Sequence, residues 1–127
     1  MAVQHQVAFS ASVGGAGVIA GGPYGCADSS VVTALSACMD DPALIDVEYL
    51  VKRANDKQAR GEIDPLSNLA RTAAWIFSGT KDTTVRPGVA HKLVKSYLGL
   101  GMNESSVTTV FDIEAAHAMP TTDYGNA

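Results

Sequence analysis

Residues 73–101, AAWIFSGTKDTTVRPGVAHKLVKSYLGLG, contain a strand, a polar loop and a helix in immediate succession. The short apolar run over 73–79 ends in glycine, which predicts a buried strand. Pro87 suits the first position of the helix that follows, and Gly99 or Gly101 is placed to end it. Apolar residues recur at helical spacing and are expected to face the core: Val89, Leu93, Val94 and Tyr97.

The rest of the chain repeats this alternation of helix and strand. We expect helices over residues 1–10 and from Asp41, as the cap, to Gly61, and strands over 12–22 and 107–113. Consecutive helix–strand units predict a parallel sheet with right-handed crossovers. The expected fold class is therefore α/β, with about three parallel strands and crossover helices.

Several side chains have an expected environment. Trp75 lies inside a predicted strand and is expected in the core. Gln4, His5 and Gln6 are assigned to the solvent side of the first helix, and His91 to the surface of a later one. The two histidines are expected to lie on the surface without a functional role.

Composition and charge exclude several classes of protein. The 127 residues fit one domain by length, 46% of them are apolar, and the net charge is −4. A clustered basic face, which nucleic-acid binding requires, is absent, as is any run of 18 apolar residues that would predict a membrane span. No signal peptide opens at Met1, so we expect either a cytosolic start or a piece of a longer protein.

Cys26 and Cys38 are separated by a loop-like stretch, residues 27–37. A local disulfide in an oxidising compartment and two packed, reduced thiols are both compatible with this spacing. A zinc site needs more ligands at closer spacing, so no metal is expected. The glycines of residues 13–22 match neither G-x-G-x-x-G nor a Walker motif, so no nucleotide cofactor is expected.

Asp82 and His117 each follow a predicted strand. Ligands of open α/β sheets bind beyond the carboxyl ends of the strands, where these two loops should meet. We expect a hydrogen-bonded pair in which the carboxylate sets the imidazole tautomer and stabilises the imidazolium. The alternative is an aspartate that caps a turn and a solvated histidine.

The order Asp then His matches the second half of an α/β-hydrolase, in which the order is Ser, Asp or Glu, His. A G-x-S-x-G elbow is absent from all 127 residues, and Ser12, the nearest imitation, is followed by a predicted strand where a helix is required. Residues 1–10 have the small, apolar character of the helix that follows such an elbow. The nucleophile is therefore expected a few residues before Met1.

Four segments, GVIAGGPYGCA, GEIDPLSNLA, IFSGTKDTTVRPGVAHKL and AAHAMPTTDYGNA, resemble the extracellular polyhydroxybutyrate (PHB) depolymerases with the nucleophile near the N-terminus. The resemblance implies a three-layer α/β-hydrolase fold and a serine esterase, with Asp82 as triad acid and His117 as triad base. It also favours a Cys26–Cys38 disulfide and a secreted or periplasmic parent protein. Tyr24, in the GGPYGC loop, is expected either to line the substrate cleft or to pack in the turn.

The resemblance further implies that residues 1–127 are a single partial α/β-hydrolase domain, truncated at both ends and inactive alone. The intact enzyme would hydrolyse short-chain 3-hydroxyalkanoate esters or polyesters without a cofactor. An unpaired sheet edge predicts a homodimer or aggregation of the isolated chain. The alternatives are a non-catalytic α/β binding module and, with less support, a nucleotide-binding domain.

Overall fold

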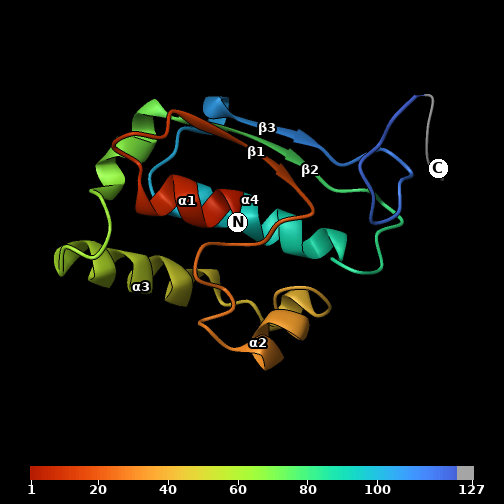
Figure 1. Ribbon diagram of the computed structural model, residues 1–127, viewed down its shortest axis with the longest axis horizontal. Coiled ribbons are helices and arrows are strands. Elements are labelled where there is room, and N and C mark those ends of the chain that lie inside the picture. Colours follow the sequence, from red (N-terminus) through yellow and green to blue (C-terminus); the bar gives the residue numbers. More distant parts are fainter. Residues whose placement is uncertain (123–127) are drawn as a thin grey trace.

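Figure 1 shows the computed structural model, which describes residues 1–122. Helices and strands alternate along the chain in the expected way. Their bounds are α1 (Ala2–Ala8), β1 (Gly15–Ile19), α2 (Val31–Leu35), α3 (Val47–Ala59), β2 (Ala73–Phe77), α4 (Pro87–Gly99) and β3 (Val107–Val110). Three 3₁₀ turns complete the list: η1 (Pro42–Leu44), η2 (Leu66–Arg71) and η3 (Glu104–Ser106).

The three strands form one parallel sheet in the order β1-β2-β3. Trp75, in the middle of β2, has Gly17 of β1 and Thr108 of β3 as its partners on either side. The prediction of about three parallel strands is therefore confirmed. Because all three strands point the same way, the loops that follow them leave the sheet at one edge.

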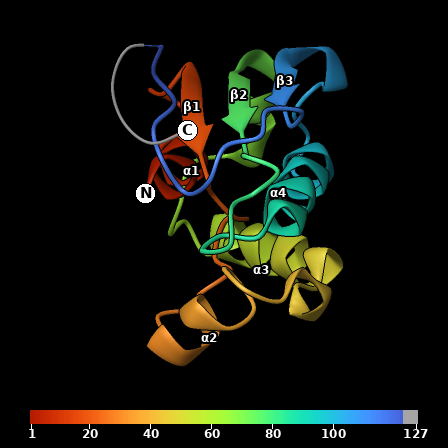
Figure 2. The same cartoon turned by 90° about the vertical axis from the view of Figure 1, so that its right-hand side faces the viewer.

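Helices cover one face of this sheet. Figure 2 shows the sheet above α1 and α4, with α3 beneath them and α2 farthest from the sheet. Side chains that point toward the helices, such as Val18 and Ile76, are buried with Val7, Leu93 and Tyr97 in the main core. Residues 1–122 thus supply two layers of the three that the resemblance implies.

The expectation that Trp75 lies in the core is wrong, because Trp75 is 41% exposed. Side chains alternate between the two faces of a strand, and Ala74 and Ile76 take the helix-covered face. Trp75 lies on the opposite face, where it stacks on Phe77 with 6.2 Å between ring centroids. The sequence run AAWIF is continuously apolar and does not reveal which face is covered.

The expectation that Gln6 lies on the solvent side of the first helix is also wrong, since Gln6 is fully buried. Its Nε2 donates to the Ala73 carbonyl at 2.9 Å, and its Oε1 accepts from the Tyr97 hydroxyl at 2.7 Å. This amide therefore joins α1, β2 and α4. Burial raises the pKa of the Tyr97 phenol.

The helix expected from Asp41 begins later than predicted. Asp41 caps only the 3₁₀ turn η1, and the chain then extends through Ile45 before Asp46 caps α3 by accepting from the Tyr49 N–H at 3.0 Å. The third strand ends at Val110, short of residue 113, with Phe77 of β2 as its last partner in the sheet. Backbone hydrogen bonds continue beyond this pair, but without the regular register of a strand.

The stretch over residues 27–37, expected to be a loop, contains the helix α2. Ser30 caps it by accepting from the Thr33 N–H at 3.2 Å, and no residue of the helix is buried. A helix of five residues is too short for hydrophobic periodicity to identify it. Within residues 1–122, no helix is long and apolar enough to cross a membrane.

Candidate active site

Asp82 lies in the loop that follows β2, with a side chain that is 2% exposed. Its Oδ1 accepts from two backbone N–H groups, those of Thr84 at 2.9 Å and Val85 at 2.8 Å. The turn-capping role considered as the alternative is thus present. It uses one carboxylate oxygen, fixes the orientation of the other, and so leaves Oδ2 available for a second partner.

His117 supplies that partner from the loop that follows β3. Its Nδ1 lies 2.9 Å from Oδ2 of Asp82, so the expected hydrogen-bonded pair is confirmed. The histidine side chain is 46% exposed whereas the carboxylate is buried.

The two loops are held together by backbone contacts beyond the ends of the strands. Thr80 donates its N–H to the Ile113 carbonyl at 2.9 Å, and Lys81 donates to the Ala115 carbonyl at 3.1 Å. Gly79 lies so close to Ala115 that a Cβ there would be 2.0 Å from its carbonyl oxygen. The absence of a side chain at Gly79 therefore lets the Asp82 loop meet the His117 loop.

This arrangement is suited to general-base chemistry. A carboxylate that accepts the Nδ1 proton leaves the lone pair of the imidazole on Nε2, and it stabilises the positive charge after Nε2 takes a proton. The neighbouring ion pair of Lys81 with Glu114, at 2.8 Å, is mostly exposed and contributes little to holding the loops. The described residues contain no cluster of three or more metal-ligating side chains.

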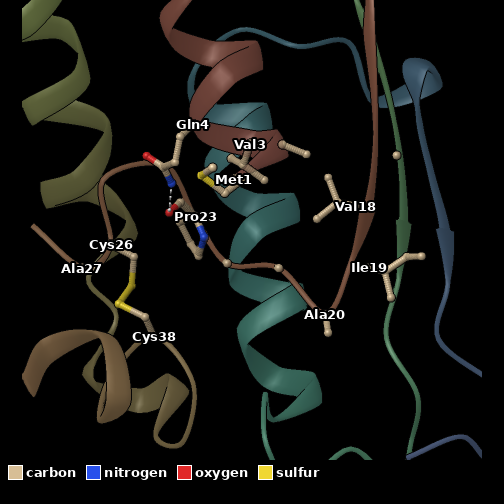
Figure 3. A pocket seen from close by; sticks show the side chains of 14 residues that line it. Met1, Val3, Gln4, Val18, Ile19, Ala20, Pro23, Cys26, Ala27 and Cys38 are labelled. Atoms are coloured by element: carbon tan, nitrogen blue, oxygen red, sulfur yellow. Dashed lines mark hydrogen bonds between the residues drawn. A yellow bond between two sulfur atoms is a disulfide. The ribbon is translucent and has the colours of Figure 1, made fainter. Parts of the chain in front are cut away.

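A pocket of about 390 Å³ lies at the carboxyl end of the neighbouring strand β1. Figure 3 shows Met1, Gln4 and Pro23 close together on one side, Val18, Ile19 and Ala20 across from them, and the Cys26–Cys38 disulfide below. Gln4 makes two hydrogen bonds to the GGPYGC loop: its Nε2 donates to the Pro23 carbonyl at 3.5 Å, and its Oε1 accepts from the Gly25 N–H at 3.1 Å. Gln4 thus holds the GGPYGC loop against α1, a role that its polar, exposed pattern in the sequence did not reveal.

Tyr24 packs in the turn, as one of its two expected placements had it. The residue is 8% exposed and belongs to the main core, and the Lys57 ammonium lies 5.4 Å from its ring centroid. Tyr24 also lines a second pocket, of about 690 Å³, together with Phe9. A contact of Tyr24 with substrate remains a prediction.

The Cys26–Cys38 disulfide implied by the resemblance is confirmed. The two cysteines are 12 residues apart in sequence with Cα atoms 5.9 Å apart. The bond closes the segment that contains α2, and both cysteines line the pocket beside β1.

Two curated relatives match the chain over its whole length. It is 45% identical over 128 residues to a poly(3-hydroxybutyrate) depolymerase of Delftia acidovorans, covering 26% of that protein. It is 36% identical over 131 residues to a polyhydroxybutyrate depolymerase of Talaromyces funiculosus, covering 36%. The chain therefore spans about a quarter to a third of the length of these relatives. No protein-family model matches it.

Two solved structures are similar to the fold. One is a serine-to-alanine variant of PHB depolymerase complexed with an R3HB trimer, with a TM-score of 0.67 and 30% identity over 87% of this chain and 33% of that one. The other is the crystal structure of PHB depolymerase from Penicillium funiculosum, with a TM-score of 0.66 and 30% identity over 83% and 31%.

Proposed function

We propose, from the premise that the whole chain is homologous to part of the PHB depolymerases, that it carries the acid and base of a serine carboxylic-ester hydrolase. The observation that carries this proposal is the 2.9 Å contact between Asp82 Oδ2 and His117 Nδ1. Residues 1–127 are on this view one part of an α/β-hydrolase domain.

The chemistry follows from the geometry of the pair. His117 Nε2 removes the proton of a serine hydroxyl as its oxygen attacks the ester carbonyl, and the imidazolium then protonates the departing alcohol. Water hydrolyses the acyl-enzyme by the same base. Asp82 keeps Nδ1 protonated throughout, and its buried Oδ1 cannot rotate away without losing two backbone hydrogen bonds.

The nucleophile is proposed to come from a segment that joins α1 from its N-terminal side. No G-x-S-x-G occurs in the 127 residues, and Met1 lines the pocket at the carboxyl end of β1. That pocket and the two loops follow three adjacent parallel strands at one edge of the sheet. A serine-to-alanine variant in the relative that holds an R3HB trimer is consistent with a serine nucleophile.

The proposed substrates are polyesters of 3-hydroxyalkanoates and short-chain esters of the same acids. The Cys26–Cys38 disulfide supports export from the cytosol, because such bonds persist in oxidising compartments. Homodimerisation through the edge of the sheet remains a prediction.

The test is Asp82→Asn in the parent protein, assayed on a soluble short-chain hydroxyester. We expect kcat to fall by about four orders of magnitude, the loss known for this change in a serine protease triad. Glu114→Gln, which alters an exposed carboxylate in the same pair of loops, is the control and should stay within twofold. Full activity of Asp82→Asn would contradict the assignment.

Two further results bear on the nucleophile. The coding sequence upstream should place a serine elbow within about ten residues of Met1, and the isolated chain should not hydrolyse the ester. A parent protein that is inactive as wild type would instead favour the non-catalytic binding module.

A further inference from the structure

A second segment of the chain, residues 38–40, holds the loop that carries Asp82. The Arg86 N–H, at the end of that loop, donates to the Met39 carbonyl at 2.8 Å. The Arg86 guanidinium also pairs with Asp40 at 3.2 Å, but both side chains are at least half exposed, so this ion pair contributes little. The backbone hydrogen bond is therefore the main polar contact between the two segments.

Val85 adds an apolar contact next to this hydrogen bond. It is 6% exposed and belongs to a second core cluster, against which Cys38 and Met39 pack. The same residue donates its N–H to Oδ1 of Asp82 at 2.8 Å. A displacement of Val85 therefore changes the orientation of the carboxylate, and with it the direction in which Oδ2 points.

The Cys26–Cys38 disulfide fixes the position of residues 38–40. Cys38 immediately precedes Met39, and Cys26 lies in the loop that follows β1. The helix that leads into residues 38–40, α2, buries none of its own residues and so gives the segment little support. The crosslink thus lies one residue from the carbonyl that holds the Asp82 loop.

We propose that this disulfide positions the acid of the catalytic pair, an inference that rests on the proposed function. It holds the Met39 carbonyl in place, and that carbonyl holds Arg86. Val85, the neighbouring residue, then directs Asp82 at His117. Because the disulfide acts through other residues, it is a positioning group and takes no part in the proton transfers.

The competing interpretation is that the disulfide only stabilises the fold as a whole. In that case it acts by limiting the conformations of the unfolded chain, and the NMR signals of a chain that is still folded do not change when the bond is broken. Positioning predicts that the native state itself changes, and that the change is confined to the Asp82 loop and the disulfide-closed segment.

The experiment reduces the disulfide of the full 127-residue chain with a water-soluble trialkylphosphine. The disulfide takes up two electrons and two protons to give two thiols, while the phosphine becomes a phosphine oxide with an oxygen atom from water. The chain contains only these two cysteines, and both line the pocket beside β1, where a small reagent can reach them. NMR spectra are compared for the oxidised, the reduced and the reoxidised chain.

On reduction, the Nδ1 proton of His117 should exchange with water at least about tenfold faster in saturation-transfer measurements, because Asp82 is held less firmly. The amide signals of Val85 and Arg86 should shift, whereas that of Ile76, in the sheet, should not. Reoxidation should restore all of them. Unchanged loop signals in a reduced chain that circular dichroism shows to be folded would overturn the proposal, as would shifts spread evenly over the sheet.

A matched pair of valine variants tests the same link with the disulfide intact. Val85→Ala shortens the side chain that packs in the second core cluster, and Val32→Ala makes the same change at a 77% exposed position inside the disulfide-closed segment. The Nδ1 proton of His117 should exchange faster with water in Val85→Ala and at the wild-type rate in Val32→Ala. Should the reduced chain unfold, a wild-type rate in Val85→Ala would still overturn the proposal.

The parent protein provides a kinetic readout on a soluble short-chain hydroxyester. Val85→Ala should lower kcat by about tenfold, within the loss of up to about a hundredfold that a misplacement of about 1 Å causes. KM should stay within twofold, because Asp82 acts on the proton transfer. Val32→Ala should match the wild type in both. Loss in KM alone would overturn the positioning role. If the wild-type parent hydrolyses no ester while reduction still changes the Nδ1 signal, the proposed function fails and the structural link stands.

Discussion

Adding a single methyl group at Gly79 should separate the two halves of the candidate site. A Cβ built at this position lies 2.0 Å from the Ala115 carbonyl oxygen and 2.7 Å from its carbonyl carbon. Both are backbone atoms, so no side-chain rotation can relieve the contact. In Gly79→Ala the loop that carries His117 must move away from the loop that carries Asp82.

The size of the effect follows from this distance. Ordinary van der Waals contact begins at 3.4 Å, so Ala115 must shift by roughly 1.4 Å. A shift of that size takes the Lys81-to-Ala115 hydrogen bond, now 3.1 Å, out of range and strains the Thr80-to-Ile113 bond beside it. Overpacking costs about 1–3 kcal/mol and each lost hydrogen bond about 0.5–1.5 kcal/mol. We expect the free energy of unfolding to fall by about 3 kcal/mol.

Urea unfolding measures that loss, and NMR reports on the site. In the wild type the Nδ1 proton of His117 should be protected and shifted downfield by Asp82, and in Gly79→Ala this signal should disappear. Gly17→Ala is the matched control, because nothing lies within 4 Å of a Cβ there; its stability should stay within about 1 kcal/mol of wild type. A Gly79→Ala protein with wild-type stability and an intact Nδ1 signal would refute the reasoning.

Three further outcomes are expected. Replacing Cys26 and Cys38 by alanine should lower the free energy of unfolding by about 3 kcal/mol in denaturant titrations, since the bond closes a short loop, and reductant should affect only the wild type. Tyr97→Phe should cost about 1–2 kcal/mol at neutral pH by leaving Gln6 Oε1 without its 2.7 Å donor. Burial raises the pKa of Tyr97 above its value in the unfolded chain. The contribution of Tyr97 to wild-type stability is therefore complete below about pH 10 and declines as the pH rises further. Stability-versus-pH curves of Tyr97→Phe should lack this decline. Ser78→Ala should be neutral or stabilising by up to about 1 kcal/mol, because the buried hydroxyl has no hydrogen-bond partner within residues 1–122; a clear loss of stability would reveal a partner for it.

Features that depend on short-range order could be predicted. The strand of residues 73–77 and the helix that starts at Pro87 follow from local apolar periodicity and from proline and glycine at their ends. The pairing of Asp82 with His117 required one more step, the rule that parallel strands bring their following loops to the same edge. Each is a consequence of chain order alone.

Features that depend on what covers a surface could not be predicted. Gln6 was expected to face solvent and is buried, whereas Trp75 was expected in the core and is exposed. Burial depends on which face of a helix or strand another element packs against. The helix α2 was also not predicted, because five residues are too few to establish a periodic pattern.

The sequence by itself determined the alternation of helices and strands, the parallel sheet, and the positions of an acid and a base after successive strands. The tertiary structure alone decided that Oδ2 of Asp82 faces Nδ1 of His117 at 2.9 Å, that Gly79 must lack a side chain for the loops to meet, and that the valines of α2 face water. The physical reason is that residue order specifies local conformation and strand direction. Contact distances and burial arise only when segments distant in sequence pack together.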